Sequence, residues 1–499
     1  MSSLIKASFW LSLSELAFNL SGYVIHALMG RILDTAGYGR FSIIVTFTTM
    51  VIILIGRGLP ISMSKYLSEV HKNDANQIFK IKKAALFLQW AVIVIVTLIY
   101  LALAPVFARI LNDPTLTPLF QVSSLIIPAF ALASFYAYYF TGIQEFGKKS
   151  FLKFFRSVAK IIFIVGLGYY FKVFGAIAGQ ALAPLSVYLV GYFLDPFSKV
   201  KNKKKPGFKN FAADRLLMKK LVHFAWPIVL FMLFYEFMIT LNLYFVKAIL
   251  QDDSLAGIYN AAMTVSRIPY YLFFFMSVIL LPKVSESVAR GLKKKTEKLL
   301  NQAFKYLLLG LFPTITILYL FSDSAMLFFY GSQYAAAGPI MSLLIIGFGF
   351  LTVFYVLTFV LNGAGLNKFP MYASLFGSVL NAVLNYFLIK SYGLAGSALA
   401  TTITAAIILL IAFFYANKKI ARFISAFSIA KYLAASLAIF WIGSYLSQGR
   451  YIFILWSFLL IAIYFIFIII MRELGRKDYQ YLIKALSRNK KDRALNKKI

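Results

Sequence analysis

Long apolar runs separated by short polar segments dominate the hydropathy pattern of this chain. Most runs last about twenty residues, enough for a helix rising ~1.5 Å per residue to cross the ~30 Å hydrocarbon core of a bilayer. Apolar and polar positions do not alternate within them, so the pattern predicts spanning helices rather than a barrel. Together with their Pro, Gly and charged boundaries, the runs predict fourteen helices, at residues 7–30, 40–63, 84–110, 119–141, 155–171, 174–194, 221–249, 257–281, 304–321, 337–361, 370–389, 394–416, 428–447 and 451–471.

The Lys and Arg residues support this count, because they gather in alternate segments between the predicted helices. Of the 51 basic residues, 41 lie at the two ends of the chain or in every second connecting segment, seven lie in the opposite segments, and three lie within predicted spans. Basic residues accumulate in cytoplasmic loops. We therefore expect a multi-pass protein of the cytoplasmic (inner) cell membrane with both termini in the cytoplasm.

The composition excludes several classes of protein and of functional site. With 61% hydrophobic and 14% charged residues, the chain of 499 residues has too little polar surface for a water-soluble globule of that size. Its formal charge of +34 lies between the spans rather than on one folded face, so we expect no nucleic-acid partner. The absence of cysteine excludes thiolate catalysis and Cys-based metal sites, and His26, His71 and His223 stand at unrelated places.

An internal repeat with an offset of 218 residues divides the chain. Each copy holds six predicted helices, an even number, so both copies insert with the same orientation and relate by an axis along the membrane normal. Parallel repeats of this kind are a transporter design. The matching motifs are Asp34-x4-Gly39-x-Phe41 with Asp252-x4-Gly257-x-Tyr259, and Lys172-x-Phe174-Gly175 with Lys390-x-Tyr392-Gly393.

The expected fold is all-α and integral to the membrane, with two parallel six-helix repeats followed by two C-terminal helices. Basic residues and helical spacing of apolar residues in the tail indicate an amphipathic helix on anionic lipid. The expected parts are an N-terminal lobe (1–195), a basic cytoplasmic linker (196–220), a C-terminal lobe (221–416), helices thirteen and fourteen (417–471) and the cytoplasmic tail (472–499).

The repeat, the helix count and one stretch of the second repeat resemble a known family. That stretch is Asn381-x3-Asn385…Tyr392-Gly393-x2-Gly396-x-Ala398-x-Ala400-Thr401. In these features the chain is similar to the polysaccharide-transporter (Wzx-like) branch of the multidrug/oligosaccharidyl-lipid/polysaccharide (MOP) flippase superfamily. The resemblance implies alternating-access transport of polyprenyl-diphosphate-linked oligosaccharide through a V-shaped cavity between two lobes. The first repeat departs from the pattern, with Lys160 near the place where the second has Ser378 and Asn381.

Polar residues at helical spacing inside several predicted spans indicate faces that avoid lipid. Exposure of polar groups to lipid is costly, so these stripes predict either a cavity lining or interhelical hydrogen bonds, and both interpretations stay open. The residues expected to line a substrate cavity are Arg57, Asn19, His26, Asn260, Thr264, Arg267, Asn381 and Asn385.

The charged residues within spans suggest substrate and coupling sites. Arg267 lies ten residues below Gly257, ~15 Å deep and near the midplane, where its permanently charged fork suits a diphosphate. Arg57 lies nearer the inner face, at a level similar to Glu15, so an ion pair between them is the alternative to a cavity role. Glu15 and Glu236 stand in apolar walls and are candidate sites for a coupling cation, Na+ or H+.

Two further features lie toward the predicted cytoplasmic side. Lys153, Arg156 and Lys160 form a basic stripe at the start of the fifth helix. The stripe indicates either snorkelling to lipid phosphates or capture of a substrate headgroup on the loading side. The segment 56–60, with two glycines and a proline, interrupts the second helix and is the best candidate for a hinge.

Other function classes lack the residues that they need. A membrane glycosyltransferase or polymerase would need paired carboxylates or a metal triad, yet the longest predicted outer loop, 322–336, offers a single Asp. No Walker-type phosphate loop is present, so ATP is not the expected energy source. We expect a secondary flippase without cofactor or metal, serving glycan biosynthesis alongside other membrane proteins. The alternatives are a cation-coupled multidrug exporter of the same superfamily and a membrane scaffold of a glycan-biosynthesis complex.

Overall fold

The computed structural model describes residues 2–56, 58–70, 75–195, 211–421 and 423–475, and within these ranges the chain is helical without strands. Eleven of the described helical stretches are long and apolar enough to span a membrane. Two of them, Phe146–Leu194 and Lys368–Lys419, each cover two expected helices, whereas the expected helix 7–30 is not among the eleven. The all-helical class is confirmed for the described residues, but the count of fourteen spans is not.

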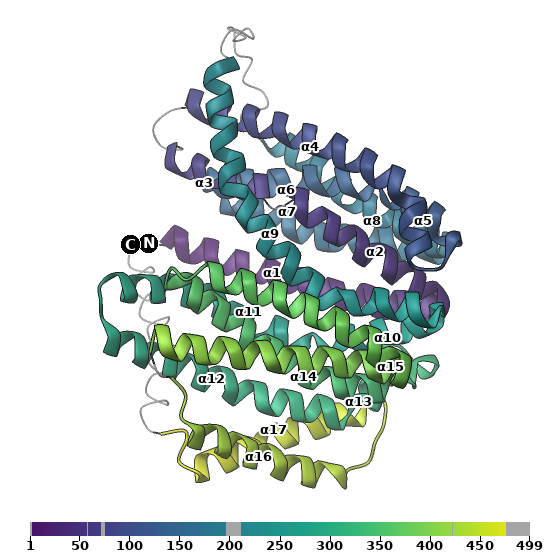
Figure 1. Ribbon diagram of the computed structural model, residues 1–499, viewed down its shortest axis with the longest axis vertical. Helices are drawn as coiled ribbons and strands as arrows, with labels where there is room; N and C mark the ends of the chain where they lie inside the picture. The colour runs from purple at the N-terminus through teal and green to yellow at the C-terminus, as the bar shows by residue number, and fades with distance from the viewer. Residues whose placement is uncertain (1, 57, 71–74, 196–210, 422, 476–499) are drawn as a thin grey trace. The chain divides into compact units, whose positions relative to one another are not determined.

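Figure 1 shows the order of the elements along the chain. Residues 196–210 of the predicted linker and residues 476–499 of the predicted tail lie outside the described residues. The elements are α1 (Ser2–Ile32), α2 (Thr35–Gly56), α3 (Gly58–Val70), α4 (Ala75–Ile110), the 3-10 helix η1 (Pro114–Leu116), α5 (Thr117–Ser123), α6 (Ile126–Gly142), α7 (Phe146–Lys160), the π-helical turn η2 (Ile161–Val165), α8 (Gly166–Leu194), α9 (Phe211–Leu250), α10 (Asp253–Ser266), α11 (Ile268–Ala289), α12 (Lys293–Leu320), α13 (Ser322–Phe329), the 3-10 helix η4 (Ser332–Tyr334), α14 (Ala337–Gly363), α15 (Lys368–Lys419), α16 (Ala426–Ser444) and α17 (Ile452–Ile470).

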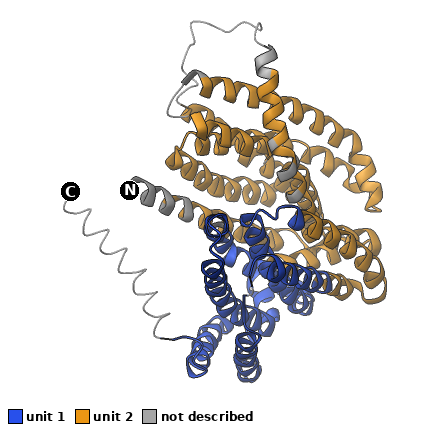
Figure 2. Ribbon diagram, turned by 60° about the vertical axis from the view of Figure 1, so that its left-hand side comes forward, with its two compact units in different colours: residues 1–5, 265–370, 402–499 blue, residues 6–264, 371–401 orange. Residues whose placement is uncertain are grey.

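The helices gather into two compact units, which Figure 2 shows in different colours. Unit 2 contains residues 6–264 and 371–401, and unit 1 contains residues 1–5, 265–370 and 402–499. The division falls near the end of α10 and twice within α15. The expected six-helix lobes and the cavity between them stay predictions.

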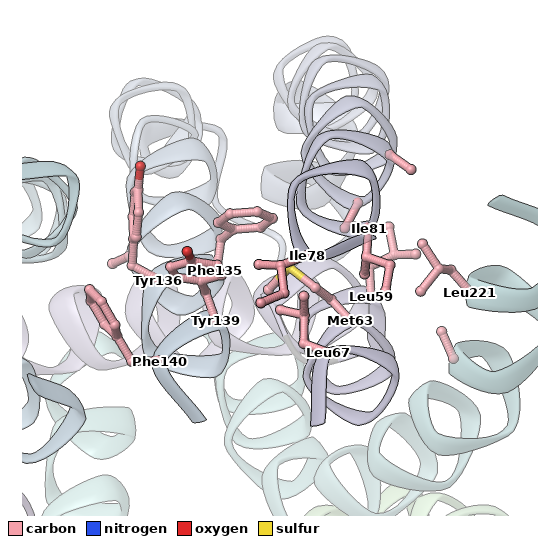
Figure 3. Close-up of a cluster of buried hydrophobic side chains, with 14 of the residues drawn as sticks. Leu59, Met63, Leu67, Ile78, Ile81, Phe135, Tyr136, Tyr139, Phe140 and Leu221 are labelled. Carbon is pink, nitrogen blue, oxygen red and sulfur yellow. The ribbon is translucent and has the colours of Figure 1, made fainter. Parts of the chain in front are cut away.

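Unit 2 has a buried core where α3, α4 and α6 meet (Figure 3). Leu59, Met63 and Leu67 repeat every four residues along α3, which places them on one face of the helix. This face packs against α4 and α6 and fixes α3 in place. The other cluster members labelled in Figure 3 are Ile78, Ile81, Phe135, Tyr136, Tyr139, Phe140 and Leu221.

Two of the long helical stretches contain a sharp bend, at Phe171 and Lys172 in α8 and at Gly393 in α15. Within α8, Lys172 has φ +52° and ψ −135°, and within α15, Gly393 has φ +55° and ψ −133°. Each bend separates two of the expected helices, so the predicted boundaries between 155–171 and 174–194 and between 370–389 and 394–416 are in the right places. The near-identical dihedrals identify the two bends as equivalent parts of the repeat.

The packing beside these bends corrects the register of the repeat. In each hairpin, the glycine three residues after the bend lies against the carbonyl oxygen five residues before it, so closely that a Cβ would collide. The pairs are Gly175 with Leu167 and Gly396 with Leu388, and their members are 221 residues apart in the sequence. The sequence-based pairing of Lys172 with Lys390 is therefore wrong by three residues, because the structure pairs Lys172 with Gly393.

The second span of the second repeat is interrupted at an arginine. Helices α10 and α11 meet at Arg267, whereas Arg57, between α2 and α3, lies outside the described residues. Pro269 in the first turn of α11 has no N–H with which to continue the hydrogen bonds of α10, so a break follows from the sequence. The single helix expected at 257–281 is therefore two helices.

In unit 1, α11 and α12 pack against α14, and α16 and α17 pack against each other and against α12. The carboxylate of Glu473, just after α17, accepts hydrogen bonds from Lys431 Nζ at 3.0 Å and from the Tyr432 hydroxyl at 3.2 Å. Burial opposes the charge on Glu473, but these partners outweigh it and hold its pKa below the usual value. The ion pair therefore fastens the end of the described chain to α16.

Candidate functional site

Two repeated glycines hold the starts of α2 and α10 together in unit 2. Gly39 lies against the carbonyl oxygen of Asp253, and Gly257 lies against that of Thr35, so closely that a Cβ on either glycine would collide with backbone. Both the glycines and their partners are 218 residues apart, so the two contacts are reciprocal, as contacts about a local two-fold axis must be. The two copies of the predicted repeat thus contact each other at this point.

The repeated aspartates of the same motif cap these two helices. Asp34 Oδ1 accepts the backbone N–H of Gly37 at 2.6 Å. Asp252 Oδ1 accepts those of Ser254 at 2.7 Å and Leu255 at 3.2 Å. A helix start leaves backbone donors unpaired, and an Asp at this position satisfies them. The motif therefore encodes two helix starts and the contact between them.

An ion-pair cluster surrounds this contact. We call Arg40, Asp113, Lys247 and Asp253 the acidic-end cluster. Lys247, whose side chain is 3% exposed, donates to Asp113 at 2.8 Å and to Asp253 at 2.6 Å, and Arg40 donates to Asp253 at 2.6 Å. Two cations face two carboxylates, so the cluster is neutral. Burial opposes the charge on Asp113, but its bonds with Lys247 and Thr115 prevail and hold the pKa of Asp113 below the usual value.

A buried chain of hydrogen bonds joins α1, α2 and α10 beside the glycine contact. His26 Nδ1 lies 2.9 Å from the Tyr38 hydroxyl, and Asn260 Nδ2 donates to Tyr38 at 3.1 Å and to Ser42 Oγ at 2.8 Å. Tyr38 is completely buried and Asn260 is 3% exposed. In this structure His26 and Asn260 fasten helices to one another, and their role in lining a cavity stays a prediction.

A second buried network joins α9 to the bend region of α15. Asn385 Nδ2 donates to Asn242 Oδ1 at 2.7 Å and to Asn381 Oδ1 at 3.0 Å, while Ser397 donates to Asn385 Oδ1 at 2.7 Å. Asn381 and Asn385 are buried. Their geometry is that of interhelical hydrogen bonding, one of the two interpretations that the sequence leaves open, and their cavity role also stays a prediction.

The basic stripe of α7 faces α1 and gathers around one aromatic ring. Lys153 Nζ, Arg156 Cζ and Lys160 Nζ lie 5.2, 5.3 and 5.1 Å from the ring centroid of Phe18. Lys153 also forms an ion pair with Glu15, whose side chain is 54% exposed. We call these five residues the α1–α7 cation cluster. Three cations thus gather around one aromatic ring, and one of them pairs with a carboxylate.

Arg267 belongs to unit 1 and stands at the break between α10 and α11. Its guanidinium carbon lies 5.7 Å from the ring centroid of Phe348 in α14, and the residue is half-buried. It precedes the first turn of α11, whose backbone N–H groups give that end of the helix a partial positive charge. The position combines a full and a partial positive charge and therefore favours anions.

The other predicted residues have varied surroundings. Asn19 is half-buried on α1, and Thr264 donates to the Asn260 carbonyl oxygen at 2.8 Å. Glu236 is half-buried on α9, and no described residue forms an ion pair or hydrogen bond with its carboxylate. Glu15 pairs with Lys153, whereas Arg57, its expected alternative partner, lies outside the described residues.

Sequence reasoning missed several residues of these sites, and three of them show why. Asp113 follows α4 directly and lies 134 positions from Lys247, so no local pattern connects them. Asn242 stands in the apolar second half of α9, and this isolated amide was a usable signal. Phe18 is one of 51 phenylalanines, and its position among cations had no sequence signal.

Comparison with known proteins places the chain in a family. The family model for polysaccharide biosynthesis proteins matches residues 4–288, more than half of the chain. The chain belongs to this family. A model of the MatE family also matches residues 227–387. Both matches agree with the resemblance to the MOP superfamily found in the sequence.

Relatives and solved structures cover most of the chain. An uncharacterised membrane protein of Methanocaldococcus jannaschii is 24% identical over 83% of this chain and 97% of its own length. The lipid II flippase MurJ of Bacillus subtilis is 24% identical over 81% of this chain and 80% of its own length. A lipid II flippase MurJ structure, in an inward closed conformation, covers 94% of this chain and 99% of its own, with 18% identity and a TM-score of 0.75.

These comparisons confirm a multi-pass membrane protein with a flippase-like fold of the MOP superfamily. The functionally named relatives include flippases, and the solved structures are of flippases and transporters. The expectation of a transporter rather than an enzyme is therefore confirmed.

Proposed function

We propose that this family member is a flippase that moves polyprenyl-diphosphate-linked oligosaccharide from the cytoplasmic to the outer leaflet by alternating access. The observation that carries the proposal is the charge contrast within unit 2. At the acidic-end cluster, helices touch and two cations pair with two carboxylates, whereas the α1–α7 cation cluster brings three cations together beside one exposed carboxylate. In the predicted topology, the acidic-end cluster faces outward and the α1–α7 cation cluster lies toward the cytoplasm. Binding of the substrate from the cytoplasmic side requires this orientation.

The chemistry of the cations supports a diphosphate cargo. Guanidinium and ammonium groups form charge-assisted hydrogen bonds with phosphate oxygens, and Arg matches them with two parallel donors. Arg267, beside the positively polarised start of α11, is the proposed cation of unit 1 for this group. The relative named as a lipid II flippase favours a second cargo, lipid II. The two cargoes carry the same kind of charged link and differ in their sugars.

The test is flipping by the full chain in proteoliposomes, with a fluorescent polyprenyl-diphosphate oligosaccharide in one arm and fluorescent lipid II in the other. Losing one bidentate charge-assisted contact should slow flipping by Arg267→Ala about tenfold or more. The matched control is Arg290→Ala, which removes an arginine whose side chain is 67% exposed. Parent-like flipping by Arg267→Ala would exclude Arg267 from the site, and failure to flip either cargo would refute the proposed function.

We propose that Glu236 is the residue through which a cation, Na+ or H+, drives transport. It is a half-buried carboxylate in an apolar stretch, and no ion pair or hydrogen bond with a described residue occupies it. Transport by Glu236→Gln should lose its dependence on an imposed Na+ or proton gradient. Unchanged gradient dependence would exclude Glu236.

The MatE match favours one competing function, export of organic cations. Ethidium efflux from the same vesicles tests it directly. Gradient-driven ethidium efflux without lipid flipping would replace our proposal with multidrug export.

A further inference from the structure

Ile424, in the connector between α15 and α16, has a backbone conformation that its residue type disfavours. Its φ is +67°, in the left-handed region, where the branched Cβ of an isoleucine is crowded by the backbone. Within the described part of the chain, the other non-glycine residues with a positive φ are Asn112, Gln144, Lys172, Gln251 and Arg472. Ile424 is the one β-branched residue of this set, so its strain is the greatest.

The usual cause of a left-handed residue does not apply to Ile424. Four of the other residues of the set lie one or two positions after the end of a helix, where a left-handed residue commonly terminates the helix, and the fifth lies at the bend in α8. Ile424 instead lies five positions after the end of α15 and two positions before the start of α16. Strain of this kind persists only where the surrounding structure imposes it, and it indicates a functional constraint.

The strained residue joins two points that are fixed. On one side, Phe423 is 3% exposed, and its ring centroid lies 4.8 Å from that of Phe304 in α12 and 5.6 Å from that of Phe413 in α15. On the other side, the hydroxyl of Ser425 accepts a backbone N–H of the first turn of α16 at 3.2 Å and so fixes the start of that helix. Ile424 is the link between this buried anchor and the helix.

Two asparagines hold the connector, and one of them acts on the strained residue. Asn301 of α12 accepts the backbone N–H of Ile424 at 2.8 Å through its Oδ1 atom. Asn417 of α15 accepts the backbone N–H of Phe423 at 3.3 Å through its own Oδ1 atom. The bond with Asn301 therefore stabilises the disfavoured conformation, whereas the bond with Asn417 belongs to the anchor.

The two helices beyond Ile424 are attached to each other. Helix α16 packs against α17, and the ion pair of Lys431 with Glu473, at 3.0 Å, joins α16 to the residues that follow α17. Helix α16 also contacts α12, where the ring centroids of Tyr432 and Phe312 lie 5.9 Å apart. A rotation at Ile424 would therefore move α16 and α17 together, relative to α12.

We propose that Ile424 is a strained hinge, that Asn301 is its catch, and that breaking the hydrogen bond between them lets the α16–α17 pair swing away from α12 while Phe423 stays anchored. The strain favours the released arrangement, and the catch and the packing of α16 on α12 favour the closed one. The inference goes beyond the proposed function, because it concerns the motion of the two C-terminal helices and does not depend on the cargo.

The test is the distance between two nitroxide labels on the full chain in nanodiscs, measured by pulsed dipolar spectroscopy. The chain has no cysteine, so Lys298→Cys on α12 and Ala430→Cys on α16, both at exposed positions, take one label each. Asn301→Ala removes one hydrogen bond and should raise the population of the longer distance about fivefold. Ile424→Gly removes the left-handed strain and should lower that population about fivefold. The variant with both substitutions should return close to the parent.

The matched control is Asn417→Ala. It removes the other asparagine bond of the same connector, but its partner Phe423 stays anchored in both arrangements, so the distances should not change. Two further variants separate strain from the loss of a side chain. Ile424→Asn should act like Ile424→Gly, because asparagine tolerates the left-handed region, whereas Ile424→Leu should keep most of the released population.

Three results would overturn the hinge. A parent-like distance distribution in Asn301→Ala would exclude Asn301 as the catch. If Ile424→Gly left the population of the longer distance unchanged, strain would not be what favours release. Equal responses to Asn301→Ala and Asn417→Ala would indicate a general loosening of the connector. None of these results depends on flipping, so the hinge and the proposed function stand or fall separately.

Discussion

The acidic-end cluster and the α1–α7 cation cluster of unit 2 use the same residue types in opposite ways. In the acidic-end cluster, the side chain of Lys247 is 3% exposed and pairs with two carboxylates. The nearby glycines bring two helices into backbone contact. In the cation cluster, Lys153 shares a carboxylate that is 54% exposed, and two further cations have aromatic rings beside them. One arrangement stabilises a closed contact, and the other gathers cations around an aromatic ring beside an exposed carboxylate.

This difference shows that the number of charged residues within a span does not identify a substrate site. Buried charges that neutralise one another strengthen packing, because breaking the pair leaves an uncompensated charge in a medium of low polarity. Charges with incomplete compensation are costly to keep, so they indicate a site that needs them. The comparison predicts that equivalent substitutions at the two clusters will have unequal effects.

The largest difference should separate Lys247→Met from Lys153→Met. Loss of Lys247 leaves Asp113 without its cation in a buried place and should cost roughly 3–5 kcal/mol of the free energy of unfolding. Loss of Lys153 breaks an exposed ion pair and should cost no more than about 1 kcal/mol. Unfolding in detergent measures both.

A matched control is Lys82→Met, which breaks another buried pair of unit 2, with Asp195. This substitution should destabilise the protein without separating the helices at the acidic-end cluster. The chain has no cysteine, so Ala256→Cys, at a fully buried position of α10, reports opening through its labelling by a membrane-impermeant maleimide. Faster labelling in Lys82→Met than in Lys247→Met would contradict our assignment of the acidic-end cluster.

The next effect concerns the glycine contact. Gly39→Val forces a side chain into the backbone of α10 and should cost about 2–3 kcal/mol while exposing the Ala256→Cys reporter. The control is Gly22→Ala, since a Cβ on Gly22 of α1 meets no atom within 4 Å. If Gly39→Val labelled as slowly as the parent, the reciprocal contact would not be what keeps this end closed.

Particular residues show how far the sequence leads. Local signals predicted the helical membrane fold, and the repeated motif located Gly39 and Gly257, but nothing in the chain says that equivalent residues of two repeats touch. The sequence also does not reveal the three-residue shift between the repeats. Lys390 matches Lys172 in residue type, but the backbone bend equivalent to that at Lys172 is at Gly393. The basic stripe of α7 was visible from its spacing. Its partner Phe18 was not, because an aromatic residue in an apolar helix has no distinguishing pattern.

A smaller effect on stability is expected at low pH. The folded-state pKa of Asp113 lies below its unfolded value, so the ion pair contributes stability above about pH 4 that is lost as the pH falls through the lowered pKa. The melting temperature should therefore fall in acid, and less steeply in Asp113→Asn, which has no such carboxylate to titrate. If the melting temperatures of the parent and of Asp113→Asn fell in parallel with pH, this ion pair would contribute nothing to the stability of the acidic-end cluster.

The smallest effect should come from the bend in α8, which lies beside the start of α2, since Val173 is within 3.4 Å of a Cβ built on Gly37. Lys172 has a positive φ that favours glycine, and the equivalent bend in α15 has Gly393. Lys172→Gly should relieve about 1 kcal/mol of strain and raise the melting temperature, whereas Gly393→Ala should lower it by a comparable amount. Because this strain lies at the bend, flipping in the proteoliposomes should not change. A raised melting temperature with slower flipping would show that the bend in α8 takes part in transport.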